Sequence, residues 1–264
     1  PAELTRTPFA FQDEIIAWSL ERDCCAVFAD TGLGKALMQL KWAQARHEQT
    51  GGRVLILAPL AVAAQTEREA VKFAIPGVKA VRPPGHTDAP IVVTHSARFH
   101  LFRDEPWTAV VLDESSILKS VDSTTRDELT KWAKRIRYRL CCTATPAPND
   151  HTELGNHSEF LGQMTRSQML GEFFVHDENE MSVQHWRLKG HAVEGFWRWV
   201  AGWAIAVRRP SDLGYEDDGY ILPPLKLVHE WLGDARVSDD RLFAVEARTL
   251  DELTSLNLIS RFRP

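Results

Sequence analysis

The stretch Ala-Asp-Thr-Gly-Leu-Gly-Lys-Ala, residues 29–36, lies between a short apolar run and a helix-like segment. Small residues in such a loop let backbone N–H groups approach phosphate oxygens, and the beginning of the following helix adds a favourable dipole. In the general pattern G-x-x-x-x-G-K-[ST], the lysine reaches the β- and γ-phosphates of a nucleotide. The stretch therefore predicts a nucleotide site in which Lys35 contacts these two phosphates.

Two positions depart from this pattern. Ala29 stands at the first glycine, where it keeps a small side chain, and Ala36 stands at the hydroxyl position. The hydroxyl ordinarily ligates Mg²⁺, so Ala36 removes a metal ligand and bears directly on catalysis. For an isolated G-x-G-K, the alternative to a nucleotide site is an ordinary glycine-rich turn that caps a helix. The motifs in the rest of the chain favour nucleotide binding.

Apolar runs alternate with helix-like stretches across residues 1–165. Runs that are apolar throughout are typical of strands buried on both faces, and their alternation with helices indicates a parallel sheet with helices on both sides. We therefore predict an α/β lobe over these residues. The expected strands are 24–29, 54–58, 91–94, 109–112 and 139–143.

The composition changes in residues 166–222, which are rich in Trp and Arg and which we interpret as a helical elaboration and linker. Apolar residues at helical spacing predict a helix over residues 194–207, with most of its tryptophans in the core. Two prolines in the stretch 221–225 exclude a helix there and predict a hinge. Residues 223–264 then begin another unit that is too short for a complete lobe, so we expect an incomplete start of a second lobe.

Two carboxylates, Asp113 and Glu114, follow directly after the run 109–112. Ligands gather at the carboxyl ends of strands in open parallel sheets. Hydrolysis of a γ-phosphate needs a charged metal and a positioned base. We assign Asp113 to Mg²⁺, mainly through water, and Glu114 to the attacking water. Carboxylates after a strand also cap the following helix, but the presence of Lys35 earlier in the chain favours the catalytic interpretation.

A third motif, Thr143-Ala144-Thr145-Pro146, follows the run that includes Cys141 and Cys142. Thr143 and Thr145 can bond the loop of Asp113 and Glu114 and report the nucleotide state to another lobe. Simple hydrogen bonding at the strand end is the alternative.

The overall composition sets further limits. The chain has 264 residues, of which 44% are hydrophobic, so it can bury one sizeable core. A net charge of −5 argues against wholesale wrapping of nucleic acid and leaves local basic patches as the means of contact. The basic stretches within 131–139 and 186–210 are such patches or, alternatively, solvated faces. No run is long enough to span a bilayer, so we expect no membrane and a cytoplasmic location.

These motifs resemble superfamily 2 helicases of the DEAD/DEAH-like group, especially the Swi/Snf-like translocases of the phage and mobile-element type. The resemblance implies a RecA-like three-layer sandwich containing a phosphate loop, which would be the N-terminal ATP-binding lobe of two. The matching stretches are Phe11-Gln12 for the adenine-reading glutamine motif, 30–35 for motif I, 57–60 for motif Ia, 113–116 for the DExx box, 143–146 for motif III, and the more specific 148–161 and 209–215.

The resemblance also implies ligands and residue roles. The cofactors would be ATP and Mg²⁺, and the partner would be nucleic acid, with double-stranded DNA preferred. Lys35, Asp113 and Glu114 would be catalytic, with Asp113 at the metal. The residues expected to bind the nucleotide are Gln12, Thr31, Gly32, Leu33, Gly34, Lys35 and Ala36, and those expected to contact the nucleic-acid backbone are Pro59, Leu60, Thr94 and His95.

The leading functional hypothesis is an ATP-dependent helicase or translocase, of which this chain is the first motor lobe. The second lobe, with the arginine fingers that complete the ATP site, has no counterpart in the chain, so we expect weak or no hydrolysis by this chain alone. Ala36 and the missing lobe also support an alternative, a non-hydrolysing ATP-gated module that binds DNA. A nucleotide kinase is a third possibility, which the Thr-Ala-Thr-Pro stretch at 143–146 disfavours.

Overall fold

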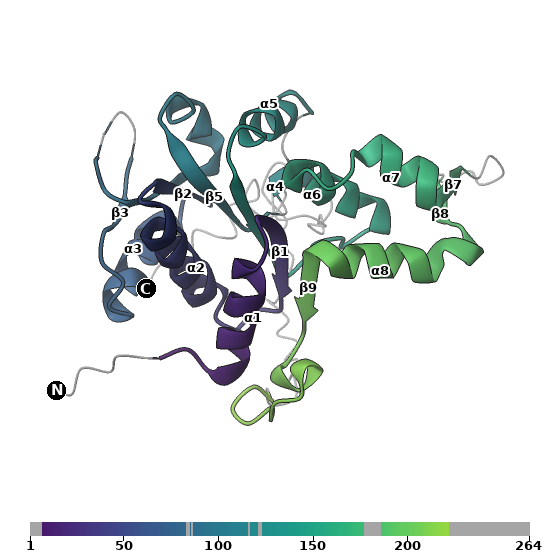
Figure 1. The fold of residues 1–264 in the computed structure, drawn as a ribbon, viewed down its shortest axis with the longest axis horizontal. Coiled ribbons are helices and arrows are strands. Elements are labelled where there is room, and N and C mark those ends of the chain that lie inside the picture. The colour runs from purple at the N-terminus through teal and green to yellow at the C-terminus, as the bar shows by residue number, and fades with distance from the viewer. Residues whose placement is uncertain are drawn as a thin grey trace, which may run out of the picture. The chain divides into compact units, whose positions relative to one another are not determined.

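The apolar runs form a seven-stranded sheet with the order β3-β4-β2-β5-β6-β1-β9 (Figure 1). Each pair of neighbouring strands in it is parallel. This computed structural model describes residues 7–221, apart from 83, 84, 86, 116, 121, 122 and 177–185. The strands are β1 (Cys24–Ala29), β2 (Arg53–Ala58), β3 (Val78–Ala80), β4 (Ile91–His95), β5 (Trp107–Asp113), β6 (Tyr138–Cys142) and β9 (Ala204–Val207).

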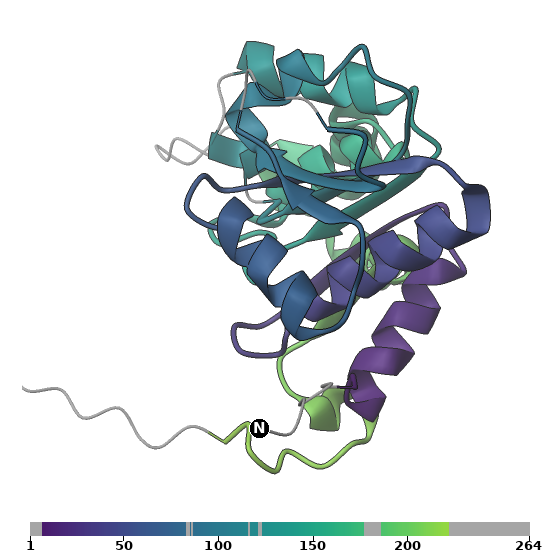
Figure 2. The same cartoon turned by 90° about the vertical axis from the view of Figure 1, so that its left-hand side faces the viewer.

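Helices cover both faces of the sheet, as Figure 2 shows. Alternate residues of a strand point to opposite faces, so Val54 and Ile56 join one hydrophobic core while Leu55 and Leu57 join the other. The predicted α/β fold is confirmed. One core contains residues of α1 (Ala10–Leu20), α2 (Lys35–Thr50) and α3 (Ala63–Lys72), and the other contains residues of α4 (Ile117–Ser120), α5 (Ser123–Ala133) and α6 (Leu154–Leu161).

Residues 166–176 and 186–203, which we call the arm, extend beyond the β9 edge of the sheet (Figure 1). The hairpin of β7 and β8 is antiparallel and separate from the main sheet. Short 3-10 turns flank these elements. The arm consists of α7 (Arg166–Phe173), β7 (Phe174–His176), β8 (Trp186–Leu188), η3 (Gly190–Ala192) and α8 (Val193–Trp203), and the turns elsewhere are η1 (Ser96–Leu101), η2 (His151–Glu153) and η4 (Pro210–Leu213).

The predicted helix over residues 194–207 is wrong in its second part. Helix α8 ends at Trp203, and Ala204–Val207 form the edge strand β9. Strand β9 pairs in parallel with β1 in the register Ala26↔Ala204 to Ala29↔Val207. The open hydrogen-bonding edge of β1 therefore overrides the helical spacing of the apolar residues. Trp203 is buried as predicted, whereas Trp197 is 44% exposed.

Parts of the sequence prediction lie outside the described residues. These are Ser116 of the DExx stretch, most of the predicted hinge at 221–225, and the predicted second unit at 223–264. Within the described part of the chain, no helix is both long enough and apolar enough to cross a membrane. Cys25, Cys141 and Cys142 are buried free thiols, and Cys24 is half-buried. Burial raises the pKa of Cys25 to about 12.

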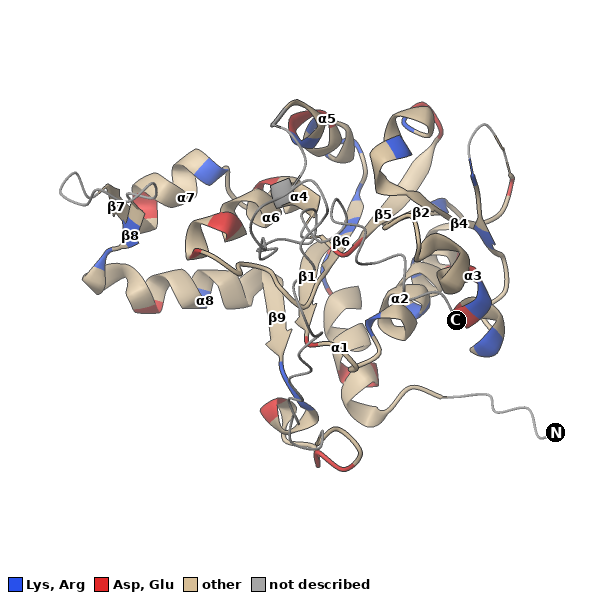
Figure 3. Ribbon diagram, turned by 180° about the vertical axis from the view of Figure 1, so that it is seen from behind, with Lys and Arg blue, Asp and Glu red and all other residues tan. Residues whose placement is uncertain are grey.

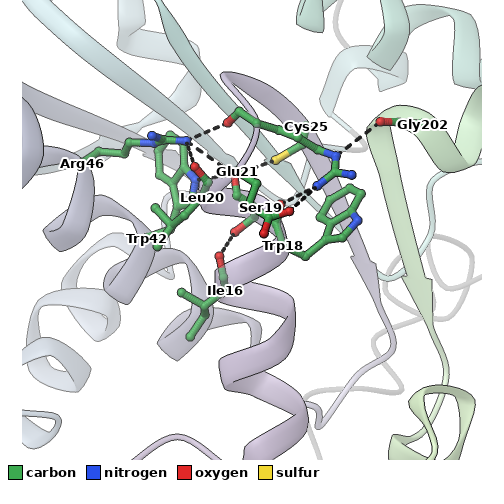
Figure 4. Close-up of polar contacts among 10 residues, drawn as sticks. Ile16, Trp18, Ser19, Leu20, Glu21, Cys25, Trp42, Arg46 and Gly202 are labelled. Atoms are coloured by element: carbon green, nitrogen blue, oxygen red, sulfur yellow. Dashed lines mark hydrogen bonds and ion pairs between the residues drawn. The ribbon is translucent and has the colours of Figure 1, made fainter.

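A buried arginine joins the end of α1 to α2 (Figure 4). The Arg46 side chain is 2% exposed and donates to the carbonyl oxygens of Leu20 at 3.0 Å and Arg22 at 2.7 Å. Its guanidinium also lies over the ring of Tyr138, 4.2 Å from the centroid. The last carbonyl groups of a helix have no partner within the helix, and a cation at that end is favourable. Arg46 therefore fixes α1 against α2.

We predict that Arg46→Met lowers the free energy of unfolding by about 1–3 kcal/mol, because it leaves buried carbonyl groups without their donor. Urea denaturation measures the change. The control is Arg68→Met, because Arg68 is exposed on α3 and its loss should cost less than about 0.5 kcal/mol. Equal stability of the two variants would contradict the role given to Arg46.

Candidate nucleotide site

The loop that joins β1 to α2 has the predicted strand–loop–helix arrangement. Gly32 and Gly34 have φ angles of 86° and 82°, a left-handed conformation that glycine adopts at little cost. The Lys35 ammonium lies against the loop, where it donates to the carbonyl oxygens of Ala29 at 2.8 Å and Asp30 at 3.0 Å. The loop thus holds the lysine at the beginning of α2, where backbone N–H groups have no partner within the helix.

Gln12 packs directly against this loop from α1. The side chain is 3% exposed, and its Nε2 donates to the Leu33 carbonyl oxygen at 2.9 Å. Its Oε1 accepts from the Phe9 N–H at 2.9 Å. A Cβ at Gly34 would lie 2.4 Å from the Gln12 Nε2, so only glycine leaves room for this contact. The structure therefore brings Gln12 together with the predicted nucleotide residues at 31–36.

The acidic pair and the threonine motif meet beside the loop. Asp113 ends β5, and Glu114 has a φ of 61°, which is uncommon for a residue with a side chain. The Thr143 hydroxyl donates to Glu114 Oε1 at 2.5 Å, and the Thr145 N–H donates to the Thr143 Oγ1 at 3.0 Å. The predicted bond between Thr143 and the acidic loop is therefore present in the structure.

The carboxyl of Asp113 lies in a largely buried setting. Burial raises the pKa of Asp113, as does the nearby Glu114 charge, whereas the side-chain amide of Gln39 and the Lys35 ammonium lower it. In a water-poor setting a carboxylate of this kind is stabilised by a cation. Asp113 is therefore a candidate ligand for a cation.

The residues present fit Mg²⁺ better than they fit a metal held by protein ligands alone. Among the described residues, no group of three or more His, Cys, Asp and Glu side chains is arranged to hold a metal ion. Mg²⁺ usually keeps several waters and is bound through one or two carboxylates plus the phosphates of a substrate. Asp113 can supply that carboxylate, whereas Ala36 offers no side-chain oxygen.

A buried pair that the sequence did not indicate lies behind the acidic loop. The Ser115 Oγ and the His157 Nε2 are 3.0 Å apart, and both residues are fully buried. The ring of Phe28 packs edge-on against His157 at 5.4 Å between centroids. His157 belongs to α6, so this hydrogen bond ties α6 to the acidic loop. No local motif marks a lone histidine on an apolar helix, which is why sequence reasoning missed it.

The residues predicted to contact nucleic acid lie at the carboxyl ends of two neighbouring strands. Strands β2 and β4 pair with Ala58 opposite His95, which places Pro59 and His95 at the same edge of the sheet. Leu60 is 63% exposed. Thr94 is fully buried and its hydroxyl donates to the Val81 carbonyl oxygen at 3.1 Å, so its side chain does not reach the surface.

Several basic residues of the two candidate patches make contacts within the chain. Figure 3 shows Lys and Arg interspersed with Asp and Glu along the ribbon. Arg139 donates to the carbonyl oxygens of Ala133 and Leu161, and Arg198 pairs with Glu194. Two residues of the first patch, Lys131 and Arg135, line a surface hollow of about 380 Å³. The other residues around it are Phe99, Arg103, Asp104, Glu128 and Trp132.

A parallel α/β sheet, with a glycine-rich loop before α2 and an acidic pair after β5, defines a RecA-like lobe. The chain belongs to the SNF2-related domain family, whose profile matches residues 11–169. This confirms the resemblance to Swi/Snf-like superfamily 2 helicases, which as a class are ATP-dependent nucleic-acid motors. The finer assignment to the phage and mobile-element type stays a prediction.

Two solved structures share this fold. The SWI2/SNF2 ATPase core of Sulfolobus solfataricus in complex with double-stranded DNA matches with a TM-score of 0.62 and 19% identity, over 77% of this chain and 45% of that chain. The SWI2/SNF2 ATPase core domain of the same organism gives a TM-score of 0.58 and 19% identity, over 78% and 45%. This chain therefore spans less than half of the length of either. No curated protein matches the sequence.

We predict that Gly34→Ala destabilises the protein more than Gly51→Ala does. Both glycines have positive φ angles, 82° and 67°, but a Cβ at Gly51 has no atom within 4 Å, whereas a Cβ at Gly34 meets Gln12. Both variants should lose about 1–2 kcal/mol from backbone strain, and Gly34→Ala should lose more because it displaces the buried amide. Chemical denaturation compares the two, and equal losses would show that Gln12 does not pack on the loop as described.

Proposed function

We propose that this chain is the ATP-binding lobe of a SNF2-related motor that couples ATP binding and hydrolysis to movement on double-stranded DNA. One observation carries the proposal. The lysine loop after β1, the acidic pair after β5 and the threonine motif after β6 lie together at the carboxyl edge of three adjacent strands, and Thr143 bonds Glu114. A glycine-rich turn or a helix cap alone explains none of this convergence.

Each residue has a role that follows from its position. Lys35, which now donates to two loop carbonyl oxygens, would turn to the β- and γ-phosphates when ATP enters. Asp113 would hold Mg²⁺ through water, and this ion would offset the charge of the phosphates. Glu114 would orient the attacking water and accept its proton. The hydroxyl of Thr143 occupies one oxygen of Glu114 and so fixes the direction in which the other can act.

Gln12 would contact the adenine ring while it supports the loop. A side-chain amide carries two N–H groups, and Gln12 directs one of them at Leu33. The second is then the donor for the adenine. Because the same amide touches the loop at Leu33 and Gly34, base and phosphate binding would depend on one another.

Nucleic acid would lie along the same edge, on the far side of β5 from the lysine loop. Pro59, Leu60 and His95 follow β2 and β4, and contacts from such loops to phosphates position a protein without reading sequence. The solved neighbour bound to double-stranded DNA supports this choice of partner. Thr94 would contribute only through the backbone, since its side chain is buried.

The domain organisation forms part of the proposal. Residues 1–165, completed by the edge strand β9 (Ala204–Val207), would be the RecA-like lobe. The rest of 166–222 would be the helical elaboration and linker, and 223–264 the start of a second lobe. A second lobe elsewhere would supply the arginines that complete the ATP site. The match to less than half of each solved neighbour is consistent with a motor of two lobes.

One observation favours a second candidate, a non-hydrolysing ATP-gated module that binds DNA. Ala36 removes the hydroxyl that ordinarily ligates Mg²⁺. Phosphate release distinguishes the two candidates. Release by this chain that double-stranded DNA stimulates, and that Glu114→Gln abolishes, would rule out the passive module.

We predict that Lys35→Ala weakens the binding of a fluorescent ATP analogue about 10-fold or more, the value of one hydrogen bond to a charged group. Lys41→Ala is the matched control, because Lys41 lies on the same helix and outside the loop. Fluorescence anisotropy gives both affinities. Equally weak binding by wild type and Lys35→Ala would refute the nucleotide site.

We predict that Ala36→Thr strengthens binding of the same analogue about 10-fold in Mg²⁺ and leaves binding in EDTA unchanged. The added hydroxyl supplies the metal ligand that the loop lacks. Titrations with and without EDTA separate the two effects. An equal gain under both conditions, or no gain, would show that residue 36 does not face the metal.

A further inference from the structure

Gln39 is a buried amide next to the proposed metal site. It lies on α2 one turn beyond Lys35 and is fully buried. Neither its Nε2 nor its Oε1 has a hydrogen-bond partner among the described residues. The amide nevertheless lies close enough to the Asp113 carboxyl to influence it. Two polar atoms of one side chain are therefore enclosed in the protein and left without ordinary bonds, beside a functional carboxylate.

Such an amide lowers the stability of the folded protein. A buried polar group without a partner destabilises a protein by about 1–3 kcal/mol, whereas an apolar side chain of the same shape would not. Gln39 is also not a surface residue, because it is fully buried and so are its chain neighbours Met38 and Leu40. The unsatisfied amide points to a ligand that completes its hydrogen bonds.

The position of Gln39 on the helix indicates which ligand. Residues three apart on a helix share a face, so Gln39 lies beside Ala36, where a hydroxyl would ordinarily contact Mg²⁺. Residues four apart share that face too, which aligns Gln39 with Lys35. The amide thus lies between the position that lacks a metal ligand and Asp113, the carboxylate proposed to hold the metal.

We propose that Gln39 is a positioning residue of the Mg²⁺·ATP site and offsets the absence of a hydroxyl at residue 36. When Mg²⁺·ATP binds, its Nε2 would donate to the Asp113 carboxylate, and its Oε1 would accept from a water beside the ion. Partners of this kind orient metal ligands, and their loss typically weakens metal binding. The inference rests on the proposed nucleotide site and adds a residue to it.

An amide suits this place better than a carboxylate does. Asp113 already lies beside a second carboxylate, Glu114. A third negative charge on the same spot would add to that repulsion. The amide provides a donor for the carboxylate and an acceptor for water without any net charge. This combination suits a carboxylate such as Asp113 that holds a metal in the protein interior.

The test compares Gln39→Met with Gln44→Met in the full chain. Met has the unbranched shape of Gln without its polar atoms. Gln44 lies on the same helix and bonds Glu48 at 2.9 Å, away from the loop. A fluorescent ATP analogue is titrated with Mg²⁺ and with EDTA. We expect Gln39→Met to lose about 10-fold in affinity with Mg²⁺ and less than about 2-fold in EDTA, while Gln44→Met changes neither.

Thermal melting of the ligand-free protein provides an independent readout. Because Gln39→Met removes an unpartnered polar group, its melting temperature should equal or exceed that of the wild type. The variant would then be more stable and bind Mg²⁺·ATP less well, a combination that a purely structural amide cannot produce. If Gln39→Met does not melt cooperatively, Gln39→Leu carries the same expectations.

A double variant tests the link to residue 36. In an Ala36→Thr background the threonine hydroxyl supplies the ligand, so Gln39→Met should cost less with Mg²⁺ there than in the wild-type background. Wild-type affinity of Gln39→Met in Mg²⁺, or an equal loss in EDTA, would overturn the role of Gln39 while leaving the nucleotide site intact. Failure of the nucleotide site itself is recognised separately, because wild type and Lys35→Ala would then bind equally weakly.

Discussion

The parallel pairing of β1, β6 and β5 is the constraint on which the site depends. In this register Val27 lies opposite Cys142, and Cys142 lies opposite Asp113, so the three strands end at the same edge. Each strand is buried on both faces, and a slip by one residue would turn its apolar side chains to the wrong face. The two cores thus hold Lys35, Glu114 and Thr143 together, although they are far apart in sequence.

Much of this arrangement could be predicted, because it follows from local patterns. Strands buried on both faces are continuous apolar runs, and the phosphate loop has a fixed spacing of small residues. Strand β9 could not be predicted, since Ala204–Val207 continue a helical pattern and become a strand only because β1 offers a free edge. The buried contacts of Arg46 and the unpartnered amide of Gln39 could not be predicted either, because both arise from packing between distant elements.

Residue 36 determines whether the loop itself can supply a side-chain ligand for Mg²⁺. With alanine at this position Gly34 is left-handed and Lys35 lies against the loop, but the metal would depend on groups outside the loop. Among the described residues, Asp113 and Gln39 are positioned to help hold the metal. The lobe would then bind the nucleotide by itself, whereas hydrolysis would also require a second lobe. The family and the fold are compatible with such a division.

Amide hydrogen exchange tests most directly whether this lobe alone forms the phosphate site. Peptides covering residues 31–36 and 113–115 should gain protection when Mg²⁺·ATP is added, because the nucleotide would take up loop N–H groups and order the acidic loop. Peptides covering β9 (Ala204–Val207) should not change. Protection that appears elsewhere in the chain and leaves residues 31–36 unchanged would contradict the account.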